Sequence, residues 1–167
     1  MRISQIRSQD ISNGEGVGIA LFVQGCDFHC FNCFNSDTWD FTKGKNWNKE
    51  QQDGLLFLLN REYIRRVSIL GGEPLHDNNV DDVIYLLEKI REDFPTKKIW
   101  LYTGYTWEEA ITNSKRAKAI SLCDVVIDGS YVHDLRDSHL KWRGSSNQRV
   151  IDVQKTIQNK DITLWCD

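Results

Sequence analysis

Short apolar runs alternate with amphipathic helical segments along most of this chain, and this alternation limits the possible folds more than any other feature. Strands are predicted at residues 18–24, 67–70, 98–103, 124–127 and 150–153, and helices at residues 48–62 and 80–93. Such alternation produces βαβ units and a mainly parallel sheet. A closed eight-stranded barrel takes about 250 residues, whereas this chain has 167. We therefore expect an α/β fold, a partial, open (β/α) barrel with a mainly parallel sheet, in a single domain over residues 1–167.

Two polar residues mark where helices are expected to begin. Asn79 precedes the apolar stripe of residues 80–93 and is predicted to be the N-cap of that helix. Thr106 precedes a further helix and is followed three residues later by Glu109, which is the spacing of a capping box. Both signals place a helix shortly after a loop that follows a predicted strand.

Charge and hydropathy exclude several classes of protein. The net charge is −3 and the two signs are mixed along the chain, so we expect neither a nucleic-acid partner nor an anionic membrane surface. The first residues lack the apolar stretch of a secretory signal, and the apolar run at 55–59 is far too short to span a membrane. A cytoplasmic location is the resulting expectation.

Glycine and polar residues recur directly after the predicted strands. The carboxyl ends of parallel strands meet at one edge of a sheet, and α/β proteins bind their ligands at that edge. Four segments therefore form a candidate site: Gly25-Cys26, Gly71-Gly72-Glu73-Pro74, Thr103-Gly104-Tyr105 and Asp128-Gly129-Ser130.

Three of the five cysteines, Cys26, Cys30 and Cys33, lie within eight residues in the spacing C-x3-C-x2-C. This clustering and the odd total argue against a disulfide framework and indicate metal ligation in a reducing compartment. Three thiolates could hold a [4Fe–4S] cluster with one iron open, whereas four-cysteine electron carriers close every position. Two alternatives stay open at this point. One is a zinc site completed by His29 or a distant histidine, and the other is a set of buried cysteines without a ligand.

The cysteine spacing resembles the signature of the radical S-adenosylmethionine (SAM) superfamily. The resemblance implies a radical SAM type of partial barrel, in which Cys26, Cys30 and Cys33 ligate a [4Fe–4S] cluster. SAM would chelate the open iron through its amino and carboxylate groups. One electron would then cleave SAM into methionine and a 5′-deoxyadenosyl radical, a reaction that the cofactors carry while the protein positions them.

The same resemblance implies which residues bind SAM. In this superfamily a GGE motif engages the methionyl amine, and residues around the third cysteine lie near the adenine. The corresponding residues of this chain are Gly71, Gly72 and Glu73 for the amine, and Asn32, Cys33 and Phe34 for the adenine.

Four candidate positions either differ from the superfamily pattern or are chosen by their place after a strand. Asn32 stands where many radical SAM enzymes have an aromatic residue, so backbone contacts rather than side-chain stacking are expected there. Thr103, Tyr105 and Asp128 are further candidates for cofactor binding, chosen because they are polar and follow strand ends. Turn or cap residues would show the same pattern.

Residues 10–153 are similar to a narrower family, the activating proteins of anaerobic ribonucleoside-triphosphate reductases. The segment Trp142-Arg143-Gly144-Ser145-Ser146-Asn147-Gln148 is the most specific to that family. Many of its members have glycine at position 32. The other segments that carry the similarity are residues 10–14, 21–23, 38–39, 74–76, 79–80, 99–105 and 124–129.

This narrower resemblance implies a reaction and its partners. The 5′-deoxyadenosyl radical would take a hydrogen atom from the α-carbon of one glycine in the reductase large subunit, leaving a glycyl radical. A reduced flavodoxin or ferredoxin type of protein would donate the electron. The alternatives are an activating enzyme for another glycyl-radical protein, of the formate-lyase type, and an iron–sulfur or zinc module that catalyses nothing.

Overall fold

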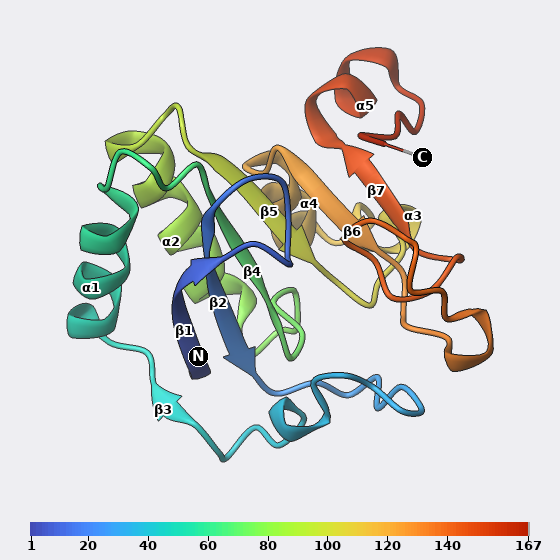
Figure 1. Ribbon diagram of the computed structural model, residues 1–167, viewed down its shortest axis with the longest axis horizontal. Helices are drawn as coiled ribbons and strands as arrows, with labels where there is room; N and C mark the ends of the chain where they lie inside the picture. The colour runs from blue at the N-terminus through green and yellow to red at the C-terminus, as the bar shows by residue number, and fades with distance from the viewer. Residues whose placement is uncertain (167) are drawn as a thin grey trace.

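The computed structural model describes residues 1–166, and Asp167, the last residue of the expected domain, lies outside the described part. One seven-stranded sheet carries the fold (Figure 1). Its strands are β1 (Arg2–Asp10), β2 (Gly18–Gln24), β3 (Lys45–Asn46), β4 (Arg66–Gly71), β5 (Lys98–Tyr102), β6 (Val125–Asp128) and β7 (Arg149–Asp152). The helices are α1 (Lys49–Leu59), α2 (Val80–Asp93), α3 (Trp107–Ala110), α4 (Ser114–Ser121) and α5 (Val153–Asn159), with 3₁₀ turns η1 (Ser36–Thr38) and η2 (His133–Leu135).

The sheet has a parallel centre and antiparallel edges. Its strand order is β3-β1-β2-β4-β5-β6-β7, in which β2, β4, β5 and β6 pair in parallel. The pairs β3–β1, β1–β2 and β6–β7 are antiparallel. The predicted α/β class and the open sheet are thus confirmed, and the parallel arrangement covers the four central strands. Those four strands end at one edge, as a ligand site there requires.

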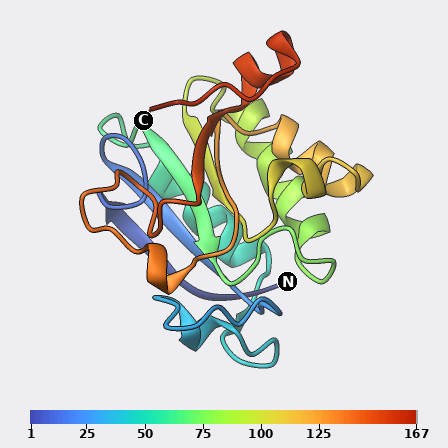
Figure 2. The ribbon, with the colours of Figure 1, turned by 90° about the vertical axis from the view of Figure 1, so that its right-hand side faces the viewer.

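One face of the sheet is covered by helices and forms the main core. On β2, Ile19, Leu21 and Val23 point to this face, where they join apolar residues of all five helices. Figure 2 shows α2, α3 and α4 along this side of the sheet. Every residue of β2 is buried, which explains why a central parallel strand is one continuous apolar run.

Elements with strong local signals were predicted closely. The strand at 18–24 and the helix at 80–93 match β2 and α2 to the residue. The strand β1 was missed because only Ile3 and Asp10 of its nine residues are buried, so it shows little apolar patterning. The predicted capping box of Thr106 and Glu109 is confirmed at the start of α3.

Asn79 stands at the N-cap position of α2, as predicted, but its side chain does not cap the helix. The side chain accepts no hydrogen bond from the helix backbone. Its amide instead donates to the carbonyl oxygens of Gln24, at 3.1 Å, and of Glu73, at 3.0 Å. The residue is 1 % exposed and joins two loops at the carboxyl edge of the sheet. Each hydrogen bond of this buried amide contributes about 0.5–1.5 kcal/mol to stability, and leaving the amide unpaired would cost about 1–3 kcal/mol.

The opposite face of the sheet contains a buried ion pair. Arg66 of β4 is fully buried and donates from Nη2 to the Asp10 carboxylate, at 2.8 Å, and from Nη1 to the Ser68 hydroxyl, at 2.6 Å. Burial alone would raise the pKa of Asp10, but the hydrogen bonds and charge of Arg66 hold it below the ordinary value. A Cβ at Gly14 or Gly18 would come within 2.7 or 2.4 Å of the Arg66 side chain. The glycines after β1 therefore make room for this arginine.

Within residues 1–166, no helix combines the length and the apolar character needed to cross a membrane.

Substitution Asp10→Ala should lower the free energy of unfolding by about 3–5 kcal/mol, because it leaves the Arg66 guanidinium buried without its counter-charge. Urea unfolding monitored by circular dichroism measures this change. Asp53→Ala, which removes the exposed pair with Lys49, is the matched control and should cost no more than about 0.5 kcal/mol. Equal effects of the two substitutions would contradict the structural importance of the buried pair.

Candidate functional site

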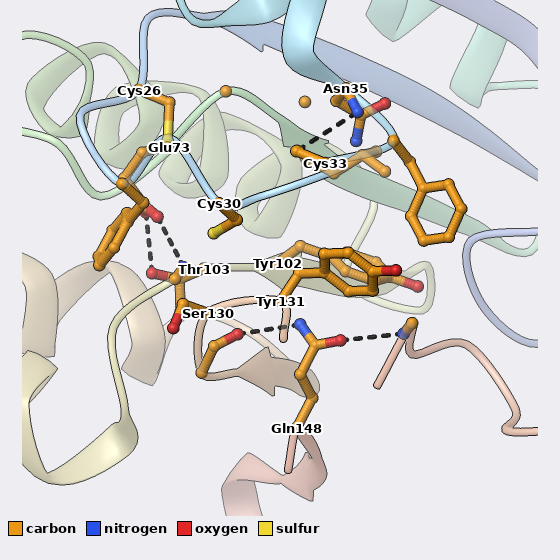
Figure 3. Close-up of a pocket in the computed structure, with 18 residues that line it drawn as sticks. Cys26, Cys30, Cys33, Asn35, Glu73, Tyr102, Thr103, Ser130, Tyr131 and Gln148 are labelled. Atoms are coloured by element: carbon orange, nitrogen blue, oxygen red, sulfur yellow. Dashed lines mark hydrogen bonds between the residues drawn. The ribbon is translucent and has the colours of Figure 1, made fainter. Parts of the chain in front are cut away.

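A pocket lies at the carboxyl edge of the parallel strands and brings the cysteine loop against the ends of β4, β5 and β6 (Figure 3). It contains about 710 Å³ of space free of protein atoms, part of it open to solvent. Cys26, Cys30 and Cys33 all line it. The four segments predicted to meet at this edge each contribute at least one lining residue.

The cysteines lie on an irregular loop between β2 and η1 that is held at both ends. The N–H groups of Gly25 and Cys26 donate to the carbonyls of Thr38, at 2.7 Å, and Trp39, at 3.0 Å, which closes the loop. Asn32 adopts a left-handed conformation with φ of 54°. Asparagine and glycine tolerate this region best, which explains physically why either residue suits this position.

Backbone N–H groups lie near the cysteine sulfurs. The N–H of Asn35 donates to Cys33 Sγ at 3.4 Å. Burial raises the pKa of Cys26 to about 11, and backbone hydrogen bonds from Phe28 and His29 oppose this rise. Burial also raises the pKa of Cys30, against a backbone hydrogen bond from Tyr131. Bound iron would supply the positive charge that stabilises the thiolates, and N–H groups at the sulfurs are typical of cluster sites.

The three sulfurs are placed differently from the ligands of a single ion. Within residues 1–166, no three His, Cys, Asp or Glu side chains are grouped as the ligands of one metal ion would be. A cubane cluster binds each thiolate through a separate iron, so its ligands do not converge on one point. Three cysteines that share one pocket, each with backbone donors nearby, are compatible with that requirement.

The glycines after β4 allow this loop to contact the cysteine loop directly. The N–H of Gly72 donates to the Val23 carbonyl at 2.9 Å, and that of Glu73 to the Gly25 carbonyl at 2.8 Å. A Cβ on Gly72 would lie 2.4 Å from the Gly25 oxygen, and Gly71 has φ of 106°. Glycine is therefore required here for the approach of two backbones.

Glu73 places a buried carboxylate at this contact. It accepts hydrogen bonds from the N–H of Leu75 at 2.8 Å, the Thr103 hydroxyl at 2.8 Å and the N–H of Gly104 at 2.7 Å. The residue is 1 % exposed. Burial raises its pKa to about 7, and the three donors oppose that rise. A cation bound in the pocket would favour its ionised form.

Most of the predicted cofactor-binding residues line this pocket. They are Cys33, Phe34, Gly71, Gly72, Glu73 and Thr103. Asn32, Tyr105 and Asp128 are not part of the lining, and their contact with a cofactor stays a prediction. The ring of Tyr105 packs edge-on against Phe28, which itself lines the pocket.

Asp128 is engaged in internal contacts. Its carboxylate accepts hydrogen bonds from the N–H of Trp107, at 2.7 Å, and from the Arg149 guanidinium, at 3.0 Å. These contacts fix the start of α3 and the first residue of β7. Asp128, the last residue of β6, therefore positions the pocket wall through α3 and β7.

Sequence reasoning missed three residues that close the pocket: Tyr102, Tyr131 and Gln148. Gln148 accepts from the N–H of Gly144, at 2.9 Å, and donates to the Gly129 carbonyl, at 2.9 Å. Gln148 belongs to the segment 142–148, which is the most family-specific part of the sequence, and this was the signal that could have indicated a role for it. The buried Tyr102 hydroxyl has no hydrogen-bond partner among residues 1–166, and nothing in its apolar strand indicated a site.

Comparison with known proteins identifies close relatives. A family profile described as a 4Fe-4S single cluster domain matches residues 12–151, which include all three clustered cysteines and Glu73. The anaerobic ribonucleoside-triphosphate reductase-activating proteins of Salmonella typhi and Escherichia coli K12 are each 41% identical over 152 residues, covering 90% of this chain and 97% of theirs. The protein of the same name from Enterobacteria phage T4 is 35% identical over 150 residues, covering 90% of this chain and 93% of its own.

Substitution Gly72→Ala should separate the GGE loop from the cysteine loop, because the Gly25 carbonyl cannot move aside as a flexible side chain could. We expect a loss of about 1–3 kcal/mol in the free energy of unfolding, and less iron bound after anaerobic reconstitution. The control is Gly54→Ala on α1, where an added methyl meets no atom within 4 Å. It should instead stabilise the helix by about 0.5–1 kcal/mol. Normal iron content in the Gly72 variant would contradict the proposed close approach.

The pKa of Glu73 predicts how the stability of the metal-free protein depends on pH. An acid with a higher pKa in the folded than in the unfolded chain binds its proton more tightly when folded. The contribution of Glu73 is therefore largest below its ordinary pKa of 4.5 and is lost as pH rises through about 7. Urea unfolding between pH 5 and 8 should show a decrease of up to about 3 kcal/mol in the wild type that is absent in Glu73→Gln. Parallel curves would contradict the raised pKa.

Proposed function

The chain belongs to the family of anaerobic ribonucleoside-triphosphate reductase-activating proteins, and we propose that it activates such a reductase by radical SAM chemistry. The observation that carries this proposal is the pocket in which three clustered cysteines face a glycine-lined loop and a buried carboxylate. The high coverage of relatives with this name favours it over a formate-lyase type of activase and over a module without activity.

In this proposal Cys26, Cys30 and Cys33 would hold a [4Fe–4S] cluster with one iron open to SAM. When bound, these cofactors would supply the SAM cleavage and radical chemistry that remove a hydrogen atom from a glycine α-carbon of the reductase. The loop contributes N–H groups that stabilise thiolate charge, such as the one that Asn35 directs at Cys33 Sγ.

The GGE loop is proposed to bind the methionyl end of SAM. Gly71 and Gly72 let an ammonium group approach backbone carbonyls, and the Glu73 carboxylate lies beside them to pair with its charge. Thr103 and Gly104 orient that carboxylate by hydrogen bonds. Because the Glu73 carboxylate is almost completely buried, this ion pair would hold SAM in one orientation.

The adenine end is proposed to lie against the third cysteine. The backbone around Cys33 and the ring of Phe34 face the pocket, whereas Asn32 would act through its left-handed backbone. Tyr105 would act through Phe28, against which it packs. Asp128 would act through the Arg149 pair that positions the pocket wall.

A partial barrel of the radical SAM type is the proposed interpretation of the open sheet. An open edge leaves a route for a segment of another protein to reach the cofactors, and the glycine to be activated lies on such a segment. The electron is proposed to come from a reduced flavodoxin or ferredoxin type of protein.

Anaerobically reconstituted protein, mixed with dithionite and SAM, should release 5′-deoxyadenosine, and adding the reductase large subunit should produce a glycyl radical detectable by electron paramagnetic resonance. Cys30→Ala should abolish both products while circular dichroism shows a retained fold. Cys166→Ala, outside the cluster, is the control and should keep both. Absence of 5′-deoxyadenosine from the wild-type protein would refute the proposal.

A further inference from the structure

A second cavity continues from the cofactor pocket into an arginine-lined groove. It contains about 1,140 Å³ of space free of protein atoms and shares the lining residues Phe34, Asn35, Leu70 and Gly144 with the cofactor pocket. Its walls are β1, β2 and the loop between β6 and β7. Figure 2 shows that loop, in orange, beside the blue strands. A segment lying in this groove would reach the cofactor pocket without crossing the protein.

Three arginines, Arg7, Arg136 and Arg143, line this arginine groove. None of them forms an ion pair with a carboxylate within residues 1–166. The Arg7 guanidinium lies 4.5 Å from the Phe22 ring centroid, and that of Arg136 lies 5.3 Å from the Phe34 ring centroid. Their N–H groups are thus held over aromatic rings and remain available as hydrogen-bond donors.

The other residues that line the groove occupy few of these arginine N–H donors. Arg143 uses one N–H on the carbonyl of Gln148, at 2.9 Å. The carboxylate of Asp137 accepts hydrogen bonds from the backbone and ring of the neighbouring His139. Phe22, Phe34, Leu70 and Trp142 provide the apolar part of the lining. The groove therefore combines apolar contact area with donors in excess.

A second groove on the other side of the cofactor pocket lacks this property. It shares Phe28, Gly104, Gly129 and Ser130 with the pocket and is lined by Glu108, Glu109 and Asp128. Its arginine, Arg149, is paired with Asp128 and with Glu108. We call this the acidic groove. Its donors are already used within the chain.

We infer that the arginine groove receives the glycine-bearing segment of the reductase large subunit as extended main chain, an inference that rests on the proposed function. The reacting atom is a backbone α-carbon without a side chain, so recognition close to it has to act on the backbone. An extended segment offers one carbonyl acceptor per residue, and a guanidinium offers five N–H donors. The aromatic rings supply contact area for a segment that contains glycine.

The test measures glycyl-radical formation by electron paramagnetic resonance at increasing concentrations of the reductase large subunit. Arg7→Ala and Arg136→Ala should each raise KM for the reductase about tenfold, the effect of losing one hydrogen bond to a charged group, and the double variant about 100-fold. The kcat should change less than twofold. A structural defect would instead lower kcat and SAM cleavage together.

Two variants serve as controls. Arg65→Ala removes an exposed arginine at the amino-terminal edge of the sheet, and Glu108→Gln changes the charge of the acidic groove. Both should leave KM unchanged.

The possible outcomes separate this inference from the proposed function. A wild-type protein that forms no glycyl radical refutes the proposed function and this inference with it. If the wild type is active and both arginine variants keep its KM, the inference about the arginine groove is wrong and the proposed function is unaffected. The groove inference is also wrong if only Glu108→Gln raises KM, or if the arginine variants lose SAM cleavage measured without the reductase.

Discussion

The carboxylate of Glu73 is the interaction on which the candidate site depends most. It lies almost completely buried between the ends of β4 and β5 and accepts hydrogen bonds from Leu75, Thr103 and Gly104. Its own backbone donates to the start of the cysteine loop, and its carbonyl accepts from the Asn79 side chain. The segments at Gly25, Asn79 and Thr103–Gly104 therefore meet at this one residue. Its carboxylate can accept from three donors because it has two oxygens with several acceptor positions.

The two faces of the sheet divide the tasks of stability and chemistry. The helix-covered face is apolar and supplies the main core, so the other face can contain polar groups. That face has the Arg66–Asp10 pair toward its amino-terminal end and the cysteine pocket at its carboxyl end. The arginine groove extends from the pocket along the same face. Charges on this face are either paired internally or available to a partner.

Local signals were sufficient for the elements that bury an apolar stripe or run. The helix α2 and the strand β2 were predicted to the residue because each has a strong periodic or continuous apolar pattern. The same reasoning failed for β1, of whose nine residues only two are buried. It also did not predict that the Asn79 side chain bonds to Gln24 and Glu73 instead of the helix backbone. Six of the nine predicted cofactor-binding residues do line one pocket, because strand ends in a parallel sheet converge.

The sequence by itself determined the chemical groups and the local geometry: three thiolates at a spacing that suits one loop, and glycines where two backbones have to touch. Only the tertiary structure decided which distant residues complete the site. Gln148 reaches Gly129, and Arg7 comes to line the same groove as Arg136, through the order and pairing of the strands. The physical reason is the distance along the chain over which each effect acts. Spacing and conformational preference act over a few residues, whereas a pocket wall depends on packing between segments that are more than a hundred residues apart.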